Sequence, residues 1–246
     1  MKAAIISNLV TDNVGENQKR ILQLASRAID NGAEFILFPE VAATGLINSG
    51  NPQKDYGIAE TIPGPRNSEW SRFAAEHRTY FGAGLLEREE DRIFDSAVLY
   101  NPEGELALHY RRNDPGWHNP DDEPTIYCEG TQIPVVKSAI GRLAFLICGD
   151  LWNDKVQMNI KRKELDYLLY IFARDTKTRE RTKTEWDTEI IEYERRWRKL
   201  DANILATNLF FDHSKFGSIG GAWYLSKTKQ IVTAPILQEN VLIVEL

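Results

Sequence analysis

The sequence AEFILFPE at residues 33–40 is a continuous apolar run that ends in Pro39 and Glu40. It follows residues 15–31, in which apolar side chains recur at helical spacing before a stop at Asn31-Gly32. A short run of successive apolar residues after a helix is typical of an interior strand that is covered on both faces. Because Pro39 cannot donate a ladder hydrogen bond, the strand is expected to end there, with Glu40 at its carboxyl end.

The segments on either side extend this pattern into an α/β fold. Residues 2–8 predict a strand, so that strand, helix and strand form a βαβ unit of a mainly parallel sheet within the first forty residues. The remaining sequence predicts helices over 68–78, 156–165 and 178–200, and strands over 80–86, 95–101, 104–111, 131–136, 142–147, 167–173, 203–209, 221–226, 231–235 and 241–246. With no Gly/Ser linker in the sequence, one domain over 1–246 is the simplest organisation.

Composition narrows the class of protein. The 246 residues are 42% hydrophobic, and 30 basic against 36 acidic residues give a net charge of −6. This balance argues against partners such as nucleic acid or an anionic membrane, which favour a basic surface. No apolar run approaches the roughly 20 residues of a membrane span. With only two cysteines and an amino terminus that turns polar at Ser7, we expect a soluble, cytoplasmic globular protein.

Several common chemistries find no support in the sequence. The four histidines and two cysteines lack metal-ligand spacing, and no glycine-rich phosphate loop is present. Residues 217–221, GSIGG, resemble a serine elbow but lack the buried strand that would precede one. We therefore expect neither a metal nor an organic cofactor.

Cys148 and Glu40 stand out as residues that could react. Residues 143–147, LAFLI, predict a buried strand that breaks at Cys148-Gly149-Asp150, which would present the thiol at the strand's carboxyl end. The alternative for Cys148 is ordinary burial, since free cysteine is among the most buried residue types. Glu40 suits either a general base or a structural partner for a basic group. Cys128 is a weaker candidate because it falls in the long irregular segment 113–130, with no strand to fix it.

Taken together, these segments resemble the nitrilase (carbon–nitrogen hydrolase) superfamily. Residues 38–40, FPE, with Thr44-Gly45 are similar to that family's Pro-Glu strand end, and residues 147–150, ICGD, to its Cys-x-Asp nucleophile motif. Residues 195–208 and 220–230 resemble its later helix, strand and closing hairpin. The resemblance implies a four-layer αββα sandwich, a homodimer, and a Glu–Lys–Cys catalytic set that acts on an amide, nitrile or carbamoyl C–N bond.

Carried onto this chain, the resemblance makes Glu40 the general base, Cys148 the nucleophile and Glu123 a second glutamate that orients the lysine. The lysine itself is replaced, because the family's Tyr-Arg-Lys corresponds here to Tyr110-Arg111-Arg112. Arginine keeps the charge, but its planar fork tends to pair with carboxylates in a bidentate manner. Arg112 could therefore bind Glu40 or Glu123 and weaken the base, or support a thiolate and an oxyanion.

Three functions follow from these residues. The first is hydrolysis of a small C–N compound through a Cys148 thioester. The second is a nitrilase-like protein that binds a small carboxylate or amide without turnover, and the third is acyl transfer from the same thioester. For the substrate pocket we expect the backbone amide of Gly149 as an oxyanion donor, with Trp117 and Trp152 as lining side chains. His118, Tyr56 and Leu46 are further candidates for the lining, and packing in the core is the alternative for Trp152.

Overall fold

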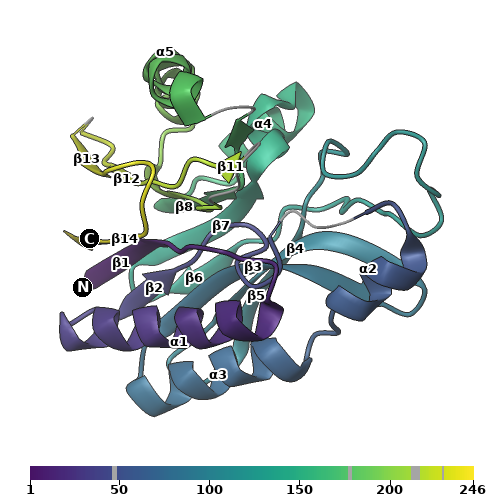
Figure 1. The fold of residues 1–246 in the computed structure, drawn as a ribbon. Helices are drawn as coiled ribbons and strands as arrows, with labels where there is room; N and C mark the ends of the chain where they lie inside the picture. Colours follow the sequence, from purple (N-terminus) through teal and green to yellow (C-terminus); the bar gives the residue numbers. More distant parts are fainter. Residues whose placement is uncertain (46–48, 177–178, 212–216, 229) are drawn as a thin grey trace.

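Two stacked six-stranded sheets with helices on their outer faces form the protein, as a computed structural model shows (Figure 1). The structure describes residues 1–45, 49–176, 179–211, 217–228 and 230–246, without the side chains of 175–183. The two layers of strands lie between α1 and α3 on one side and α4 and α5 on the other. This is the four-layer αββα sandwich that the family resemblance implies.

The first sheet contains the amino-terminal strands and the last strand of the chain. Its order is β14 (Asn240–Glu245), β1 (Lys2–Ser7), β2 (Phe35–Leu37), β3 (Tyr80–Glu89), β4 (Arg92–Tyr100) and β5 (Leu106–Arg111). Neighbours β1, β2 and β3 are parallel, and the three other pairs are antiparallel. The helices α1 (Val14–Asp30) and α3 (Pro65–His77) supply the crossovers between the parallel strands. They bury Leu24 and Trp70 against one face of this sheet.

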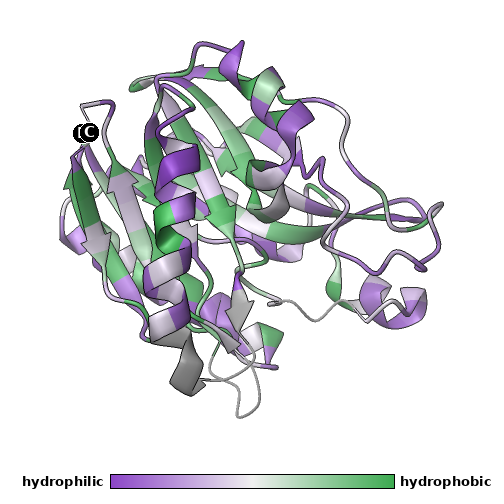
Figure 2. Ribbon diagram, turned by 90° about the horizontal axis from the view of Figure 1, so that it is seen from above, coloured by the Kyte–Doolittle hydropathy of each residue, from purple (hydrophilic) through white to green (hydrophobic). Residues whose placement is uncertain are grey.

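The second sheet repeats the same sequence of parallel and antiparallel neighbours. Its order is β6 (Val136–Ser138), β7 (Gly141–Ile147), β8 (Tyr167–Phe172), β10 (Asn203–Asn208), β12 (Ala222–Leu225) and β13 (Ile231–Ala234). Strands β7, β8 and β10 are parallel, and α4 (Asp154–Lys161) and α5 (Arg179–Trp197) follow β7 and β8. Viewed from above α5, the strands are mostly hydrophobic whereas much of the helix is hydrophilic (Figure 2).

The helix predicted over 178–200 corresponds to α5, and an aromatic stripe with helical spacing anchors it. Residue 178 itself lies outside the described residues. Trp186, Tyr193 and Trp197 are buried, and their rings pack on Phe172 of β8 and Trp223 of β12. The helical spacing of these apolar residues therefore identified the buried face of the helix correctly.

The prediction of a mainly parallel sheet is wrong. Each sheet has two parallel and three antiparallel pairs, because hairpins extend the parallel strands on one side and a further antiparallel strand completes the other. The strand predicted over 131–136 is also misplaced, since the pairing begins at Val136, after Pro134, which has no N–H to donate. The sequence analysis did not find α2 (Pro52–Ile58) or the short strands β9 (Asp175–Thr176) and β11 (Gly217–Ser218).

The main core fills the space between the sheets and continues under α5. It includes Leu37 and Tyr110 of the first sheet and Phe145, Leu169 and Leu205 of the second, all buried. Within the described part of the chain, none of the helices combines the length and apolar character that crossing a membrane requires.

Candidate active site

Two turns at strand ends, one from each sheet, bring Glu40 and Cys148 to the same region. Glu40 follows β2, and Cys148 begins the short 3-10 helix η1 (Cys148–Trp152) directly after β7. Both turns pass through left-handed backbone, with φ of 43° at Val41 and at Cys148. Such a conformation is unfavourable for a side chain with a Cβ, and it persists only where the surroundings enforce it.

Gly84 on β3 is part of what enforces the first turn. Its N–H donates to Pro39 and its carbonyl accepts from Ala42, so the turn closes directly onto the strand. A Cβ at Gly84 would lie 2.6 Å from the Cα of Glu40, closer than two carbon atoms can approach. The glycine thus allows the backbone of Glu40 to lie against the sheet.

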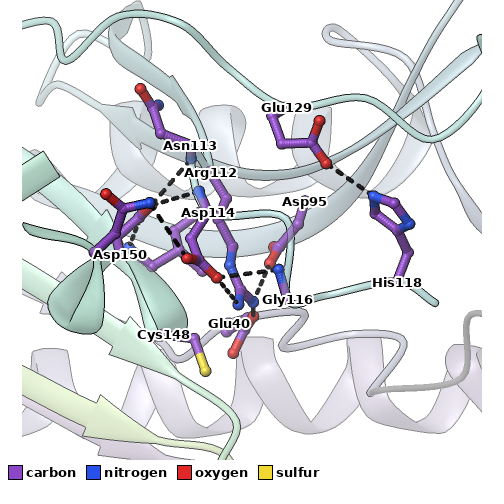
Figure 3. Close-up of polar contacts among 12 residues, drawn as sticks. Glu40, Asp95, Arg112, Asn113, Asp114, Gly116, His118, Glu129, Cys148 and Asp150 are labelled. Atoms are coloured by element: carbon purple, nitrogen blue, oxygen red, sulfur yellow. Dashed lines mark hydrogen bonds and ion pairs between the residues drawn. The ribbon is translucent and has the colours of Figure 1, made fainter. Parts of the chain in front are cut away.

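Arg112 links three carboxylates at the centre of the site (Figure 3). It follows β5, and its Nη1 lies 3.0 Å from Glu40 Oε1 and 3.3 Å from Asp95 Oδ2. Its Nη2 lies 3.3 Å from Oδ1 of Asp114 in the following loop. Arg112, Glu40 and Asp95 are buried, and Asp114 is partly exposed. Burial opposes the charge on the guanidinium, but Cys148 and the acidic neighbours outweigh that effect and raise the pKa of Arg112.

Asp95 is a component of the site that the sequence analysis missed. It lies inside β4, where residues 93–100, IFDSAVLY, place one carboxylate in an otherwise apolar strand. That single acid was a usable signal, but the predicted strand began at 95 and so treated it as a boundary. Burial and the neighbouring charge of Glu40 raise the pKa of Asp95 well above its usual range, against the opposing effect of Arg112.

Asp150 joins the ends of β5 and β7. It accepts hydrogen bonds from the Tyr110 hydroxyl at 2.6 Å and from the backbone N–H groups of Ile147, Asn113 and Asp114. Burial raises the pKa of Asp150 to about 6, although these donors favour its charged form. The aspartate of the Cys-x-Asp motif is therefore a structural clamp that holds the loop after Arg112 against the turn at Cys148.

The surroundings of Cys148 favour the protonated form of its thiol. Burial raises its pKa well above the ordinary thiol value, and the charge of Glu40 adds to this rise. Arg112 and a hydrogen bond from the Ala173 backbone act in the opposite direction without reversing it. Attack by this sulfur accordingly requires that a base remove its proton, since the thiolate is the nucleophile.

The structure places Glu123 away from this group. Its side chain is exposed and accepts a hydrogen bond at 2.9 Å from the hydroxyl of Thr125. Its backbone carbonyl accepts from the N–H groups of Ile126 and Tyr127, so a tight local turn holds the residue at the surface of the loop. The carboxylates that contact Arg112 are instead those of Glu40, Asp95 and Asp114.

The two tryptophans predicted to line the substrate pocket lie in different surroundings. Trp117 is buried in a small apolar cluster with Val41 and Ala173, the neighbours of Glu40 and of the Cys148 thiol. Trp152 is 38% exposed and packs edge-on against Tyr193 of α5, with Arg196 over its ring.

The other predicted lining residues lie further along the loops. The Nε2 of His118 donates to Oε1 of Glu129 at 2.8 Å, to the side of the Arg112 group in Figure 3. The hydroxyl of Tyr56 donates to the backbone of Asp91. Leu46 lies outside the described residues.

Gly149 is required by the packing of the site as well as by its position next to the thiol. A Cβ at this residue would overlap both Nη2 of Arg112 and Oδ1 of Asp114. Its N–H is in the first turn of η1, where backbone donors lack partners within the helix.

Within the residues that the structure describes, no three His, Cys, Asp or Glu side chains are grouped to hold a metal ion.

Comparisons with known proteins agree on the family. The model of the carbon-nitrogen hydrolase family matches residues 3–195. A bifunctional nitrilase/nitrile hydratase of Oryza sativa subsp. japonica is 23% identical over 161 residues, which are 55% of this chain and 41% of that protein. A formamidase of Helicobacter acinonychis (strain Sheeba) is 27% identical over 134 residues, 51% of this chain and 37% of that protein. The matched regions thus span about two fifths of the length of these curated relatives.

Solved structures show that the fold is shared. A carbon-nitrogen hydrolase from Helicobacter pylori G27 superimposes with a TM-score of 0.84 and 16% identity, covering 99% of this chain and 87% of that one. An amidase from Nesterenkonia sp. AN1, a mutant in which acrylamide has added to the active-site cysteine, gives a TM-score of 0.81 and 17% identity. That match covers 100% of this chain and 93% of the amidase chain.

Proposed function

Since the chain belongs to the carbon–nitrogen hydrolase family, we propose that it hydrolyses a small, non-peptide amide or related C–N compound through a thioester on Cys148. The observation that carries the proposal is the meeting of Glu40, Arg112 and Cys148 at the ends of three strands from two sheets. Its relatives include a nitrilase, a formamidase and an amidase, and these activities indicate the same class of bond.

Acylation begins with the neutral thiol. Glu40 removes the proton from Cys148 Sγ as the sulfur attacks the amide carbon, and a C–S bond forms while the carbonyl oxygen becomes an oxyanion. Glu40 then gives its proton to the nitrogen, the C–N bond breaks, and ammonia or an amine leaves. The N–H of Gly149 and the guanidinium of Arg112 are the donors assigned to the oxyanion.

Deacylation repeats these roles with water. Glu40 removes a proton from a water molecule as its oxygen attacks the thioester carbon, and the second tetrahedral intermediate collapses with the C–S bond. The proton returns from Glu40 to the sulfur, so that the carboxylic acid product leaves and the resting thiol is restored. Both half-reactions, acylation and deacylation, therefore begin with Glu40 ionised.

Arg112 suits this scheme because its contacts are divided between carboxylates. Nη1 is shared by Glu40 and Asp95, and Nη2 contacts a partly exposed Asp114. The cation is therefore not committed to one bidentate pair with Glu40, which is the arrangement that would most strongly weaken the base. The direct contact with Glu40 also favours the second candidate, a site that binds a small amide without turning it over.

Ammonia release distinguishes the two candidate functions, hydrolysis and binding without turnover. We expect the wild-type protein to release ammonia from formamide or acetamide, and Cys148→Ala to abolish the release while Cys128→Ala retains it. Binding of these amides without release would support the binding protein instead. Products analysed with an added amine acceptor distinguish hydrolysis from acyl transfer, because transfer would yield a new amide.

We further propose a homodimer, as the family resemblance implies. Met158 of α4 and Ile191 of α5 are 55% and 65% exposed, and they give the outer helical layer apolar side chains that a second copy could cover. Sedimentation at micromolar concentration tests this, and a monomer would contradict it.

A further inference from the structure

We propose that Glu40 and Asp95 hold a single proton between them at neutral pH, and that Asp95 is thereby a positioning residue for Glu40. The shared proton stands on the geometry of the site alone. The positioning role rests on the proposed function, in which Glu40 is the base.

Among the described residues, Glu40 and Asp95 share a single side-chain hydrogen-bond donor. One nitrogen, Arg112 Nη1, serves both carboxyl groups, at 3.0 Å for Glu40 and 3.3 Å for Asp95. Their other oxygens, Glu40 Oε2 and Asp95 Oδ1, are buried and receive no hydrogen bond from the described residues. Both side chains thus approach the same guanidinium nitrogen, and each keeps one buried oxygen without a donor in the described part of the chain. Two carboxylates have only acceptors, so one of the pair can donate to the other only if one acid keeps a proton.

The charges of the site also favour one retained proton. Glu40 and Asp95 are 0% and 2% exposed, and both face the one buried guanidinium of Arg112. With both acids ionised the three groups would have a net charge of −1 in a buried site, whereas one retained proton makes them neutral. Two like charges at this separation do not both ionise readily, as pairs of carboxylates in other sites show.

The surrounding groups do not supply the missing positive charge. The titratable side chains that act on Glu40, Asp95 or Arg112 from neighbouring elements are Asp114 after β5, Cys148 and Asp150 in η1 and Tyr170 on β8. Each is acidic or neutral. Burial and the charge of Glu40 raise the pKa of Asp95, in accord with a proton that stays at neutral pH.

A neutral resting group matches the charge changes of the reaction. When Glu40 takes the thiol proton, the group of Glu40, Asp95 and Arg112 becomes +1 as the substrate oxygen becomes −1, so the site as a whole stays neutral. A protonated Asp95 also donates to Glu40 and fixes the orientation of its carboxylate. An ionised Asp95 would instead compete with Glu40 for Arg112 and add a negative charge beside the oxyanion.

Infrared spectroscopy tests the shared proton without a substrate. At about pH 8, where ordinary carboxyl groups are ionised, the wild-type protein is expected to show the carbonyl stretch of a buried carboxylic acid. This band is lost in Asp95→Asn and also in Glu40→Gln, because either change leaves one carboxylate paired with Arg112. The control Asp114→Asn retains the band, since Asp114 contacts the other guanidinium nitrogen.

Each departure from this pattern overturns the shared proton. A wild-type protein with no such band has both carboxyls ionised, a result that needs no variant to fold. A band that survives in Glu40→Gln belongs to an isolated buried acid, and a band lost only in Asp114→Asn belongs to Asp114.

The positioning role has a separate test in the pH profile of kcat/KM for amide hydrolysis. As pH rises, the wild-type pair loses its remaining proton and activity declines. Asp95→Asn has no such proton to lose, so its alkaline limb moves upward by about one pH unit or more. An unmoved limb overturns the positioning role. Absence of any turnover in the wild type would contradict the proposed hydrolase and leave the infrared result to decide the shared proton.

Discussion

Arg112 Nη1 lies 3.0 Å from Glu40 Oε1, so the buried cation of the site directly contacts the carboxylate that we assign as its base. Asp95 and Asp114 contact the same guanidinium. A planar group with several donors can satisfy three carboxylates at once, whereas an ammonium is a point charge with a different reach. The three carboxylates around residue 112 therefore fit a guanidinium better than an ammonium group.

This arrangement predicts that lysine is a poor replacement. Arg112→Lys is expected to lower kcat/KM by about tenfold or more, and Arg112→Ala by about 10²–10³, the loss typical of an oxyanion donor. The matched control is Arg111→Lys, because Arg111 pairs with Glu87 and Glu89 in another group, and its activity should stay near wild type. A large gain in turnover on Arg112→Lys would show that arginine impairs the site.

The thiol of Cys148 is expected to resist alkylation at neutral pH. Its raised pKa leaves little thiolate near neutral pH, even with Arg112 nearby. Iodoacetamide labelling followed by intact mass, in a Cys128→Ala background, should show a rate that climbs steeply only on the alkaline side. Rapid labelling at about pH 6 would mean a thiolate in the resting protein, contrary to general-base activation.

The raised pKa of Asp150 predicts that the free energy of unfolding depends on pH. Its pKa rises from 3.8 to about 6 on folding, so the folded protein binds more protons there than the unfolded chain between these values. Its contribution to the free energy of unfolding is therefore complete below about pH 4 and declines as pH rises through about 6, by about 3 kcal/mol in total.

Urea unfolding of the wild type and of Asp150→Asn measures this contribution. The asparagine variant is less stable overall because it loses an acceptor, but the wild type's advantage should shrink as pH rises from about 4 to 6. An advantage that grows with pH over this interval would mean that folding lowers the pKa of Asp150.

We expect a side chain at residue 149 to lower activity. Gly149→Ala places a methyl group against Arg112 Nη2 and Asp114 Oδ1, so we expect kcat/KM to fall by about 10² as the guanidinium moves from its position. Gly57→Ala in α2 is the control, since nothing lies within 4 Å of the added Cβ. The account of the Arg112 position would be contradicted if both alanine variants kept wild-type activity.

Features of the fold and the site could be predicted from the sequence where a run of successive residues encodes them. The apolar run before Pro39 located the strand end at Glu40, and the run before Cys148 located the second one, because burial is encoded in successive residues. The mainly parallel arrangement predicted from the first βαβ unit did not extend to the whole sheet, because β3, β4 and β5 pair as antiparallel neighbours.

Of the partners of Arg112, Glu40 was among those expected, whereas Asp95 and Asp114 could not be predicted in the same way. Glu123 was expected there by position in a loop, yet local hydrogen bonds hold it at the surface. Asp95 reaches Arg112 only through the pairing of β4 with β5, in which Ser96 is opposite Arg111. Register between strands, which spacing along one segment does not specify, decides which carboxylates meet the cation.

The central claim, cleavage of a C–N bond through a thioester on Cys148, is tested most directly by mass spectrometry during turnover. Protein incubated with formamide or acetamide is quenched in acid, and its intact mass and peptides are compared with ammonia release. The account predicts an acyl group on the peptide that contains Cys148, and loss of both adduct and ammonia in Cys148→Ala. Ammonia release that persists in Cys148→Ala, or an amide series that gives neither adduct nor ammonia with the wild type, would contradict it.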